Sequence, residues 1–484
     1  MAFSIQKRPY NNHSIIGQDL IWSIKETSWN SGAFFKFKYI CYLYTGNTGT
    51  ANQLAATLKF SPNSNGVGVI NVSDILRNYV GSDNLGNNLL STNSTFKGVA
   101  FTIDATPHPI HLIDRFCLSQ NACINWYVIF KYEYSTTPYG QPNAYGTLTP
   151  GLFLKAFNGV DYGLEQLQVS GQYGVLLSNW NKKKYIRYAA AVSADISFLS
   201  NAPTTQYVGD NDYHTLSFLN GYWGLYPLQI SNIIIKQYDS SNTLLNTYTI
   251  ANTQAHGGAP LTAGSLTNTG KELLYFGVGP ANLKVFTALF ANWSYYTVEV
   301  KNPSNQNIFK VLTFNREEID CKGFEKIRLT WLNKFGTWDY YNFTKRNTRE
   351  TQIKKAEYTK IRGNYNTNNT TAATSGNFTK FDFNRGRNVL KNTAFNSIKC
   401  NSDWFRSDEE ASWIEELFIS NEVYILNGYD STDGGGNGAE YGKYLIPVVV
   451  SSKKYEKYTA ANDKLAQYEI EIEYASNMNT HLGG

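Results

Sequence analysis

The sequence predicts an all-β dominated protein with several β-sandwich-like domains and a few short helices. Three observations lead to this fold class. The chain has 484 residues, which is too long for one ordinary core. Aromatic residues make up 15% of it and charged residues only 17%, a balance opposite to that of disordered chains. Tyr, Thr, Asn and Gly are prominent, and this composition favours strands and turns over helices.

Residues 1–137 are predicted to form an N-terminal β-sandwich-like domain. Segments 33–46 and 125–137 are rich in aromatic and β-branched residues and predict two long strands. Segment 56–80 begins as a strand and breaks at the Pro-Asn-Ser-Asn-Gly run that starts at Pro62. It then predicts a short helix with Ser73 as its N-cap.

Residues 138–290 are predicted to form a central β-rich domain. Its clearest element is a hairpin within 228–251, in which Asp239-Ser240-Ser241-Asn242 supplies the turn.

Residues 291–484 are predicted to form a C-terminal β domain with one amphipathic helix at about 407–418. Ser407 and Glu410 have the spacing of a capping box at its start. Its apolar stripe consists of Ala411, Ile414, Leu417 and Phe418.

A late strand in 466–476 alternates apolar and acidic residues. Tyr468, Ile470, Ile472 and Tyr474 are expected to face inward. The row of Glu469, Glu471 and Glu473 is then expected on an exposed strand, where it either resists edge-to-edge pairing or binds a basic partner.

The segment "LTWLNKFGTWDYYNF" (329–343) is the most aromatic stretch of the chain. It predicts a hairpin, since two strand-like runs flank a short loop with Asn and Gly. Trp331 continues the face of Ile327 and Leu329 and is expected in the core, opposite the polar face of Lys326, Arg328 and Thr330. Trp338 and Tyr340 are expected on one face of the return strand. A core role is favoured for these aromatics; a stacking platform for sugars or bases and a subunit interface are the alternatives.

Candidate catalytic and metal sites are weak in the sequence. His108 and His111 flank Pro109, which excludes the helix of an H-E-x-x-H site. The glycine loop with Asp430, Asp433 and Asn437 lacks the spacing of a calcium-binding EF-hand. Carboxylates of the predicted helix are expected on its solvated face: Asp408, Glu409, Glu410, Glu415 and Glu416. We therefore expect no enzyme activity, no metal and no cofactor.

Two basic clusters are expected in solvated turns, and the alternatives are contacts with an acidic partner subunit or with DNA in a lumen. The first lies among aromatic residues and consists of Lys182, Lys183, Lys184 and Arg187. The second consists of Arg385 and Arg387. The formal charge of +5 is small for this length and argues against a dedicated nucleic-acid binder.

Other features favour a folded chain that completes its order in an assembly. The five cysteines are scattered, and reduced, mostly buried thiols are expected. The polar loops 364–377 and 429–442 have too few apolar atoms to become ordered alone. The start of the chain lacks the apolar run of a signal peptide, and no stretch has the length of a membrane-spanning helix.

Three stretches resemble virion proteins of crAss-like short-tailed bacteriophages: "KFSPNSNGVGVINVSDILRNYV", "WLNKFGTWDYYNFTKR", and the run from "WIEELFISNEVYI" to "YEIEIEYAS". The resemblance is one of pattern and covers about half of the chain. It implies a β-sandwich protein in the stacked rings of the tail barrel, and it brings no catalytic residues.

The resemblance thus implies a structural subunit of the phage tail, in a closed homo-oligomeric ring near the portal. Its partners would be copies of itself, neighbouring tail or portal proteins and, without sequence specificity, DNA passing through a lumen. Its location would be the virion, with no membrane contact. The alternative is a carbohydrate- or receptor-binding protein of the same particle.

Overall fold

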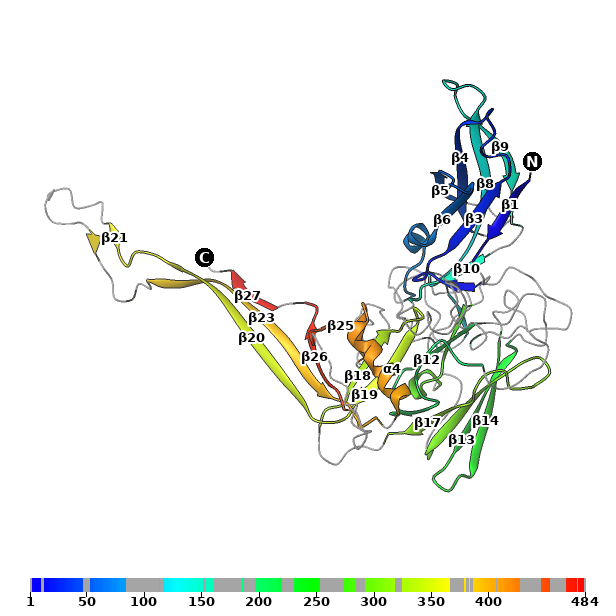
Figure 1. The fold of residues 1–484 in the computed structure, drawn as a ribbon. Coiled ribbons are helices and arrows are strands. Elements are labelled where there is room, and N and C mark those ends of the chain that lie inside the picture. Colours follow the sequence, from blue (N-terminus) through cyan, green and yellow to red (C-terminus); the bar gives the residue numbers. More distant parts are fainter. Residues whose placement is uncertain are drawn as a thin grey trace, which may run out of the picture.

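The computed structural model describes residues 2–9, 13–46, 53–83, 113, 116–119, 121–150, 154–160, 185, 196–219, 230–252, 273–283, 292–317, 324–365, 378–379, 383, 386–405, 407–426, 445–452, 467–476 and 478–482. Strands predominate and form several sheets, which confirms the predicted fold class. The molecule is extended, with an N-terminal lobe and a long hairpin that project from a common body (Figure 1).

The N-terminal lobe consists of two sheets around one core. The smaller sheet has the order β1 (Phe3–Lys7), β3 (Ile21–Glu26), β6 (Val67–Asn71). The larger has the order β2 (His13–Ile15), β10 (Leu154–Phe157), β8 (Cys123–Ser135), β4 (Phe35–Thr45), β5 (Gln53–Phe60), with β9 (Asn143–Leu148) on β8. Trp22 of β3 packs between the sheets against Trp126 and Phe130 of β8. The predicted strands 33–46 and 125–137 are therefore confirmed.

The short helix after β6 begins one residue earlier than predicted. Helix α1 (Ser73–Leu76) has Val72 as its N-cap, and the 3-10 turn η1 (Arg77–Tyr79) follows. Asn71 supplies the polar contact expected of Ser73, because its Oδ1 accepts hydrogen bonds from Ser73 N (3.1 Å) and Leu20 N (2.9 Å). The hydroxyl of Ser73 is itself buried.

The central unit also has two sheets around one core. The five-stranded sheet has the order β11 (Thr205–Val208), β17 (Leu312–Arg316), β16 (Tyr295–Lys301), β13 (Asn232–Tyr238), β14 (Leu244–Ala251). The second has the order β12 (Thr215–Leu219), β15 (Leu273–Gly277), β7 (Cys117–Leu118), and helix α3 (Pro280–Leu283) follows β15. The predicted hairpin is β13–β14, with Asn242 at a φ of 61° in its turn.

The C-terminal sheet continues into the long hairpin. Its order is β19 (Trp338–Phe343), β18 (Ile327–Leu332), β24 (Val423–Leu426), β25 (Leu445–Val450), β26 (Glu469–Tyr474), β23 (Arg387–Asn401), β20 (Asn347–Thr359), with β27 (Met478–Leu482) on β23. The two-residue strands β21 (Asn364–Tyr365) and β22 (Phe378–Thr379) pair beyond the end of β20. Helix α4 (Asp408–Ile419) begins after Ser407, whose hydroxyl accepts the N–H of Glu410 at 3.1 Å, so the predicted cap is confirmed.

Strand pairing crosses both predicted domain boundaries. β9 and β10 follow residue 137 but extend the N-terminal sheet. β16 and β17 follow residue 290 but complete the central sheet. The sheets therefore define units that end about 20 residues later than the sequence pattern indicated.

The aromatic stretch at 329–343 forms the hairpin β18–β19 and fills two cores. Trp331 is fully buried with Ile327 and Leu329, against helix α4. Trp338 and Tyr340 are each 2% exposed and belong to the cluster on the opposite face. The core role is confirmed, and because both faces are covered, these rings offer no surface for stacking a sugar or a base.

Candidate functional site

The long hairpin, here called the arm, consists of β20 and β23. The two strands pair from Asn347↔Cys400 to Thr359↔Arg387. At about 3.4 Å per residue, β20 is about 44 Å long. Its base joins the body where β26 pairs with residues 397–401 of β23, and β27 pairs with residues 391–394 further along the same strand. Figure 1 shows the arm running away from α4 and from the N-terminal lobe.

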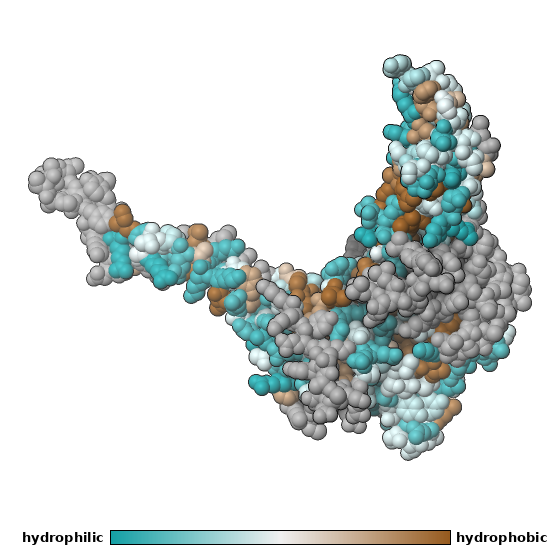
Figure 2. All heavy atoms as spheres, viewed as in Figure 1, coloured by the Kyte–Doolittle hydropathy of each residue, from teal (hydrophilic) through white to brown (hydrophobic). Residues whose placement is uncertain are grey.

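The arm is exposed along its length and nevertheless carries apolar side chains. After Asn347, every residue of β20 is exposed. Ile353 is 59% exposed, Leu390 52% and Ile361, just beyond the strand, 77%. None of the described buried apolar side chains lies between residues 344 and 397. Figure 2 shows hydrophobic residues interspersed with hydrophilic ones on this projection.

A hairpin of this kind is not expected to be stable in water without further contacts. An isolated two-stranded hairpin is marginally stable at best. Ordering its backbone costs roughly 1–2 kcal/mol per residue, and a core normally offsets that cost. The free edge of β20 also offers unpaired backbone groups to another chain. The arm therefore has the properties of an element that is covered in an assembly.

Charge is concentrated on the arm. Its two strands contain two acidic residues, Glu350 and Glu357, and six basic ones: Arg349, Lys354, Lys355, Arg387, Lys391 and Lys399. The remainder of the chain then has 37 basic and 36 acidic residues, so it is nearly neutral. Most of the chain's net positive charge thus lies on the arm.

The structure describes one residue of the two predicted basic clusters. Arg387 lies near the outer end of β23 and forms an ion pair with Glu357 across the ladder. Its side chain is 77% exposed, so this pair contributes little to stability. Arg385 lies outside the described residues, as does the first cluster of Lys182, Lys183, Lys184 and Arg187.

The row of glutamates is not at a sheet edge, which corrects the prediction for Glu469, Glu471 and Glu473. These residues are on β26, which pairs with β25 on one side and β23 on the other. Glu471 lies opposite Lys399, with 3.9 Å between Oε2 and Nζ. The inward positions are as predicted, since Tyr468, Ile470 and Ile472 are buried. The glutamates therefore belong to a sheet face beside the base of the arm.

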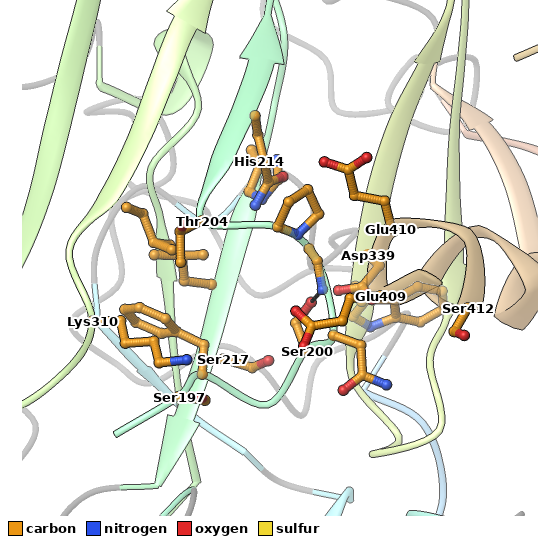
Figure 3. A pocket seen from close by; sticks show the side chains of 18 of the residues that line it. Ser197, Ser200, Thr204, His214, Ser217, Lys310, Asp339, Glu409, Glu410 and Ser412 are labelled. Carbon is orange, nitrogen blue, oxygen red and sulfur yellow. Dashed lines mark hydrogen bonds between the residues drawn. The ribbon is translucent and has the colours of Figure 1, made fainter. Parts of the chain in front are cut away.

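A pocket of about 540 Å³ lies where the central unit meets α4. One wall is formed by residues around Ser197–Thr204, with Ser217 and Lys310 nearby, and the other by the start of α4. Figure 3 shows Glu409 and Glu410 pointing from α4 toward the segments that carry Thr204 and Lys310. The other acidic residues that line the pocket are Asp408 and the buried Asp339.

Two buried carboxyls lie beside this pocket. Asp339 accepts a hydrogen bond from the indole N–H of Trp413 at 2.9 Å. Glu416 accepts hydrogen bonds from Asn201 Nδ2 (2.6 Å) and Lys334 N (3.2 Å). Glu416 is only 5% exposed, so its predicted place on the solvated helix face is wrong. It sits there because Asn201 and Lys334, both remote in sequence, supply its partners.

Burial raises the pKa of both carboxyls. The pKa of Asp339 rises to about 7, mainly through desolvation and secondarily through the charge of Glu416. Desolvation also raises the pKa of Glu416, although Lys334 opposes the shift. Between about pH 4 and 7 the folded state therefore holds a proton on Asp339 that the unfolded chain has lost.

We expect Asp339→Asn to gain stability over the wild type as pH rises. An acid whose pKa is raised on folding destabilises the fold progressively as pH increases toward that pKa, and Asn removes the buried charge. The difference in free energy of unfolding, variant minus wild type, should be larger at pH 8 than at pH 5 by at least about 1.4 kcal/mol. Urea titrations at both pH values measure this difference, and an equal difference at both contradicts the raised pKa.

A second polar cluster joins the central unit to the predicted polar face of β18. Arg328 is 4% exposed and donates to Tyr213 O (2.7 Å) and to Asn342 Oδ1 (2.6 Å). Its guanidinium lies 3.4 Å from Asp212, which also binds Lys326 at 2.7 Å. Burial alone would raise the pKa of Asp212, but the charges of Arg328 and Lys326 together lower it. The cluster fixes the central unit to the C-terminal sheet.

The described residues contain no cluster of side chains that could bind a metal ion. Within them, no three His, Cys, Asp or Glu side chains are placed to hold one ion. His108, His111, Asp430, Asp433 and Asn437 lie outside the described residues. Cys41, Cys123 and Cys400 are buried free thiols. Among the parts of the chain that the structure describes, no helix is long and apolar enough to span a membrane.

Comparison with known proteins gives no family. No protein-family model and no curated protein matches the sequence. Solved structures with some likeness include three of bacterial alpha-2-macroglobulins. The methylamine-reacted Salmonella protein has 10% identity and a TM-score of 0.18 over 97% of this chain and 23% of its own. A Salmonella mutant has 7% identity and a TM-score of 0.18 over 100% of this chain and 33% of its own. The trypsin-activated Escherichia coli protein has 9% identity and a TM-score of 0.17 over 84% of this chain and 20% of its own.

This chain therefore spans between a fifth and a third of the length of those proteins. TM-scores this low carry no argument about fold or function.

Proposed function

We propose that the chain is a structural subunit of a bacteriophage tail that assembles with copies of itself into a closed ring near the portal. The observation that supports this most strongly is the arm, because its apolar side chains and free strand edge lack cover in the single chain. The resemblance to crAss-like virion proteins supplies the setting. Neighbouring tail or portal proteins would cover the remaining faces.

Ring closure follows from the kind of contact that an arm makes. An arm that docks on a different surface of its neighbour, without receiving that neighbour's arm in return, makes a heterologous contact. Heterologous contacts repeat from copy to copy and end in a ring if the rotation closes. The two polar clusters support this role, since they hold the central unit and the C-terminal sheet in a fixed relation.

The alternative, a carbohydrate- or receptor-binding virion protein, has less support. The aromatic hairpin that would form its platform is buried on both faces. Exposed rings such as Tyr139 (95%), Tyr207 (64%) and Trp404 (57%) belong to different parts of the chain. These three rings therefore do not form one stacking surface.

Electron microscopy and native mass spectrometry of the purified protein test the proposal. We expect ring-shaped particles of one discrete mass, formed at micromolar concentration, because the exposed arm favours association. A monomer at all concentrations, together with binding on a glycan array, contradicts the proposal and favours the alternative.

A further inference from the structure

The pocket between the central unit and α4 is lined by three buried polar side chains. Ser197, Gln206 and Ser217 are 7%, 8% and 3% exposed. Among the described contacts of the chain, none of these three side chains makes a hydrogen bond. Buried hydroxyl and amide groups are normally paired, because an unpaired one has lost its hydrogen bonds to water without replacement. These groups therefore need a partner from outside the chain.

Strand alternation places Ser217 on the pocket side of β12. Leu216 and Phe218 belong to the core of the central unit, so Thr215 and Ser217 lie on the opposite face of the strand. Figure 3 shows Ser217 at this wall of the pocket. Gln206 is on β11, and both strands are paired within their sheets. The polar groups are thus held in fixed positions by the fold.

The chemistry of the lining favours a neutral ligand with several hydroxyl groups. Hydroxyl and amide side chains both donate and accept hydrogen bonds, as the hydroxyl groups of a sugar do. The lining has more carboxyl than ammonium groups, which disfavours an anion: it contains Asp339, Asp408, Glu409 and Glu410 together with Lys310. Within the described residues, no grouping of side chains could hold a metal ion.

The size and the apolar atoms of the pocket also suit such a ligand. Its volume of about 540 Å³ lies within the roughly 300–1,000 Å³ of small-molecule sites. Phe198, Pro203 and Leu312 contribute apolar atoms to the lining. Such atoms can contact the C–H groups of a sugar ring while the polar side chains bind its hydroxyl groups.

We propose that the pocket between α4 and β12 binds a neutral sugar residue, with Ser197, Gln206 and Ser217 as hydrogen-bond partners. This inference goes beyond the proposed ring and does not depend on it, because the pocket lies within one copy. It needs no exposed aromatic platform, since the ligand enters a pocket. A free monosaccharide and the terminal residue of a glycan present the same hydroxyl groups.

Isothermal titration calorimetry and saturation-transfer NMR on the whole chain test the site. The probes are the methyl glycosides of glucose, galactose, mannose and N-acetylglucosamine, and a glycan array carries the same residues at chain ends. We expect saturable binding of at least one glycoside below about 10 mM. Ser217→Ala and Gln206→Leu should each weaken it about 3- to 10-fold, because each removes one uncharged hydrogen bond to the ligand.

Stability measurements separate ligand binding from a structural role of the same side chains. Both variants should keep the urea midpoint of the wild type, because neither side chain makes a hydrogen bond among the described contacts. A lower midpoint in both would assign them a structural role and contradict the inference. The matched control is Ser64→Ala, which removes a hydroxyl from an exposed turn of the N-terminal lobe and should leave sugar binding unchanged.

The outcomes distinguish this inference from the proposed function. Binding to the array alone identifies the end of a glycan as the ligand, and binding to neither probe up to about 10 mM overturns the inference. Equal affinity of the wild type and both variants also overturns it, because the sugar then binds elsewhere. Binding of 1,5-diaminopentane in place of every sugar overturns the ligand class. Rings without sugar binding leave the proposed function intact, whereas sugar binding by a chain that forms no oligomer overturns the proposed function alone.

Discussion

Replacing Trp331 with alanine is expected to reduce the free energy of unfolding by about 3–5 kcal/mol. The indole is completely buried in the cluster between hairpin β18–β19 and helix α4. Its ring centroid lies 5.4 Å from that of Trp413, at an interplanar angle of 43°. Alanine would leave a cavity at the point where α4 meets the sheet. Strand β18, which carries Trp331, is hydrogen-bonded to β19 on one side and β24 on the other, so it cannot collapse into the cavity.

Chemical denaturation followed by circular dichroism measures this effect. Trp404→Ala is the matched control, because it removes the same side chain from a position that is 57% exposed, and it should change stability by less than about 0.5 kcal/mol. An unchanged urea midpoint for Trp331→Ala would show that α4 is not held by this core.

The sequence predicted those elements whose determinants are local. Alternation in "IRLTW" placed Ile327, Leu329 and Trp331 on one face, and the structure has all three in one core. Ser407 and the apolar positions behind it predicted α4 to within one residue at either end. In each case the signal is a period or a cap contained within about a dozen neighbouring residues.

The polar clusters were not predictable, because their partners are remote in the sequence. Arg328 reads as an exposed cation on an alternating strand, but Asp212 and Tyr213, 116 and 115 residues earlier, bury it. The sequence pattern assigns Glu416 to a solvated acidic face, whereas the structure buries it with Asn201 as a hydrogen-bond partner. A buried ion becomes acceptable only when such partners are present, and a single sequence does not show them.

The arm was missed for a different reason. Polar residues occupy both faces of its strands, so the alternation of apolar and polar residues that identifies a half-buried strand is absent. The signals that do exist are β-branched residues such as Thr348, Thr351 and Ile353, and the excess of lysine and arginine. Loops 364–377 and 429–442, expected to become ordered by assembly, lie almost wholly outside the described residues.

Shortening the arm is expected to abolish assembly and leave the body folded. Replacing residues 353–394 with Asn-Gly joins Gln352 to Phe395, which face each other across the ladder, through a favoured two-residue turn. The buried residues Ile398 and Cys400 and the pairing of β23 with β26 are retained, whereas β27 loses its partners at residues 391–394 of β23. The free energy of unfolding should therefore change by less than about 1 kcal/mol, while rings disappear from native mass spectra at concentrations that assemble the wild type.

A second deletion shows which part of the arm makes the contact. Removing only residues 366–377 leaves the β20–β23 ladder with its exposed Ile353 and its lysines, and this variant should still form rings. Rings from the shortened arm would show that assembly uses another surface, such as the uncharged edge strand β14 with Leu244 50% exposed. Loss of rings after the 366–377 deletion alone would place the contact in that loop instead of the ladder. The pair of variants thus separates an arm that binds along its length from one that only carries a binding loop.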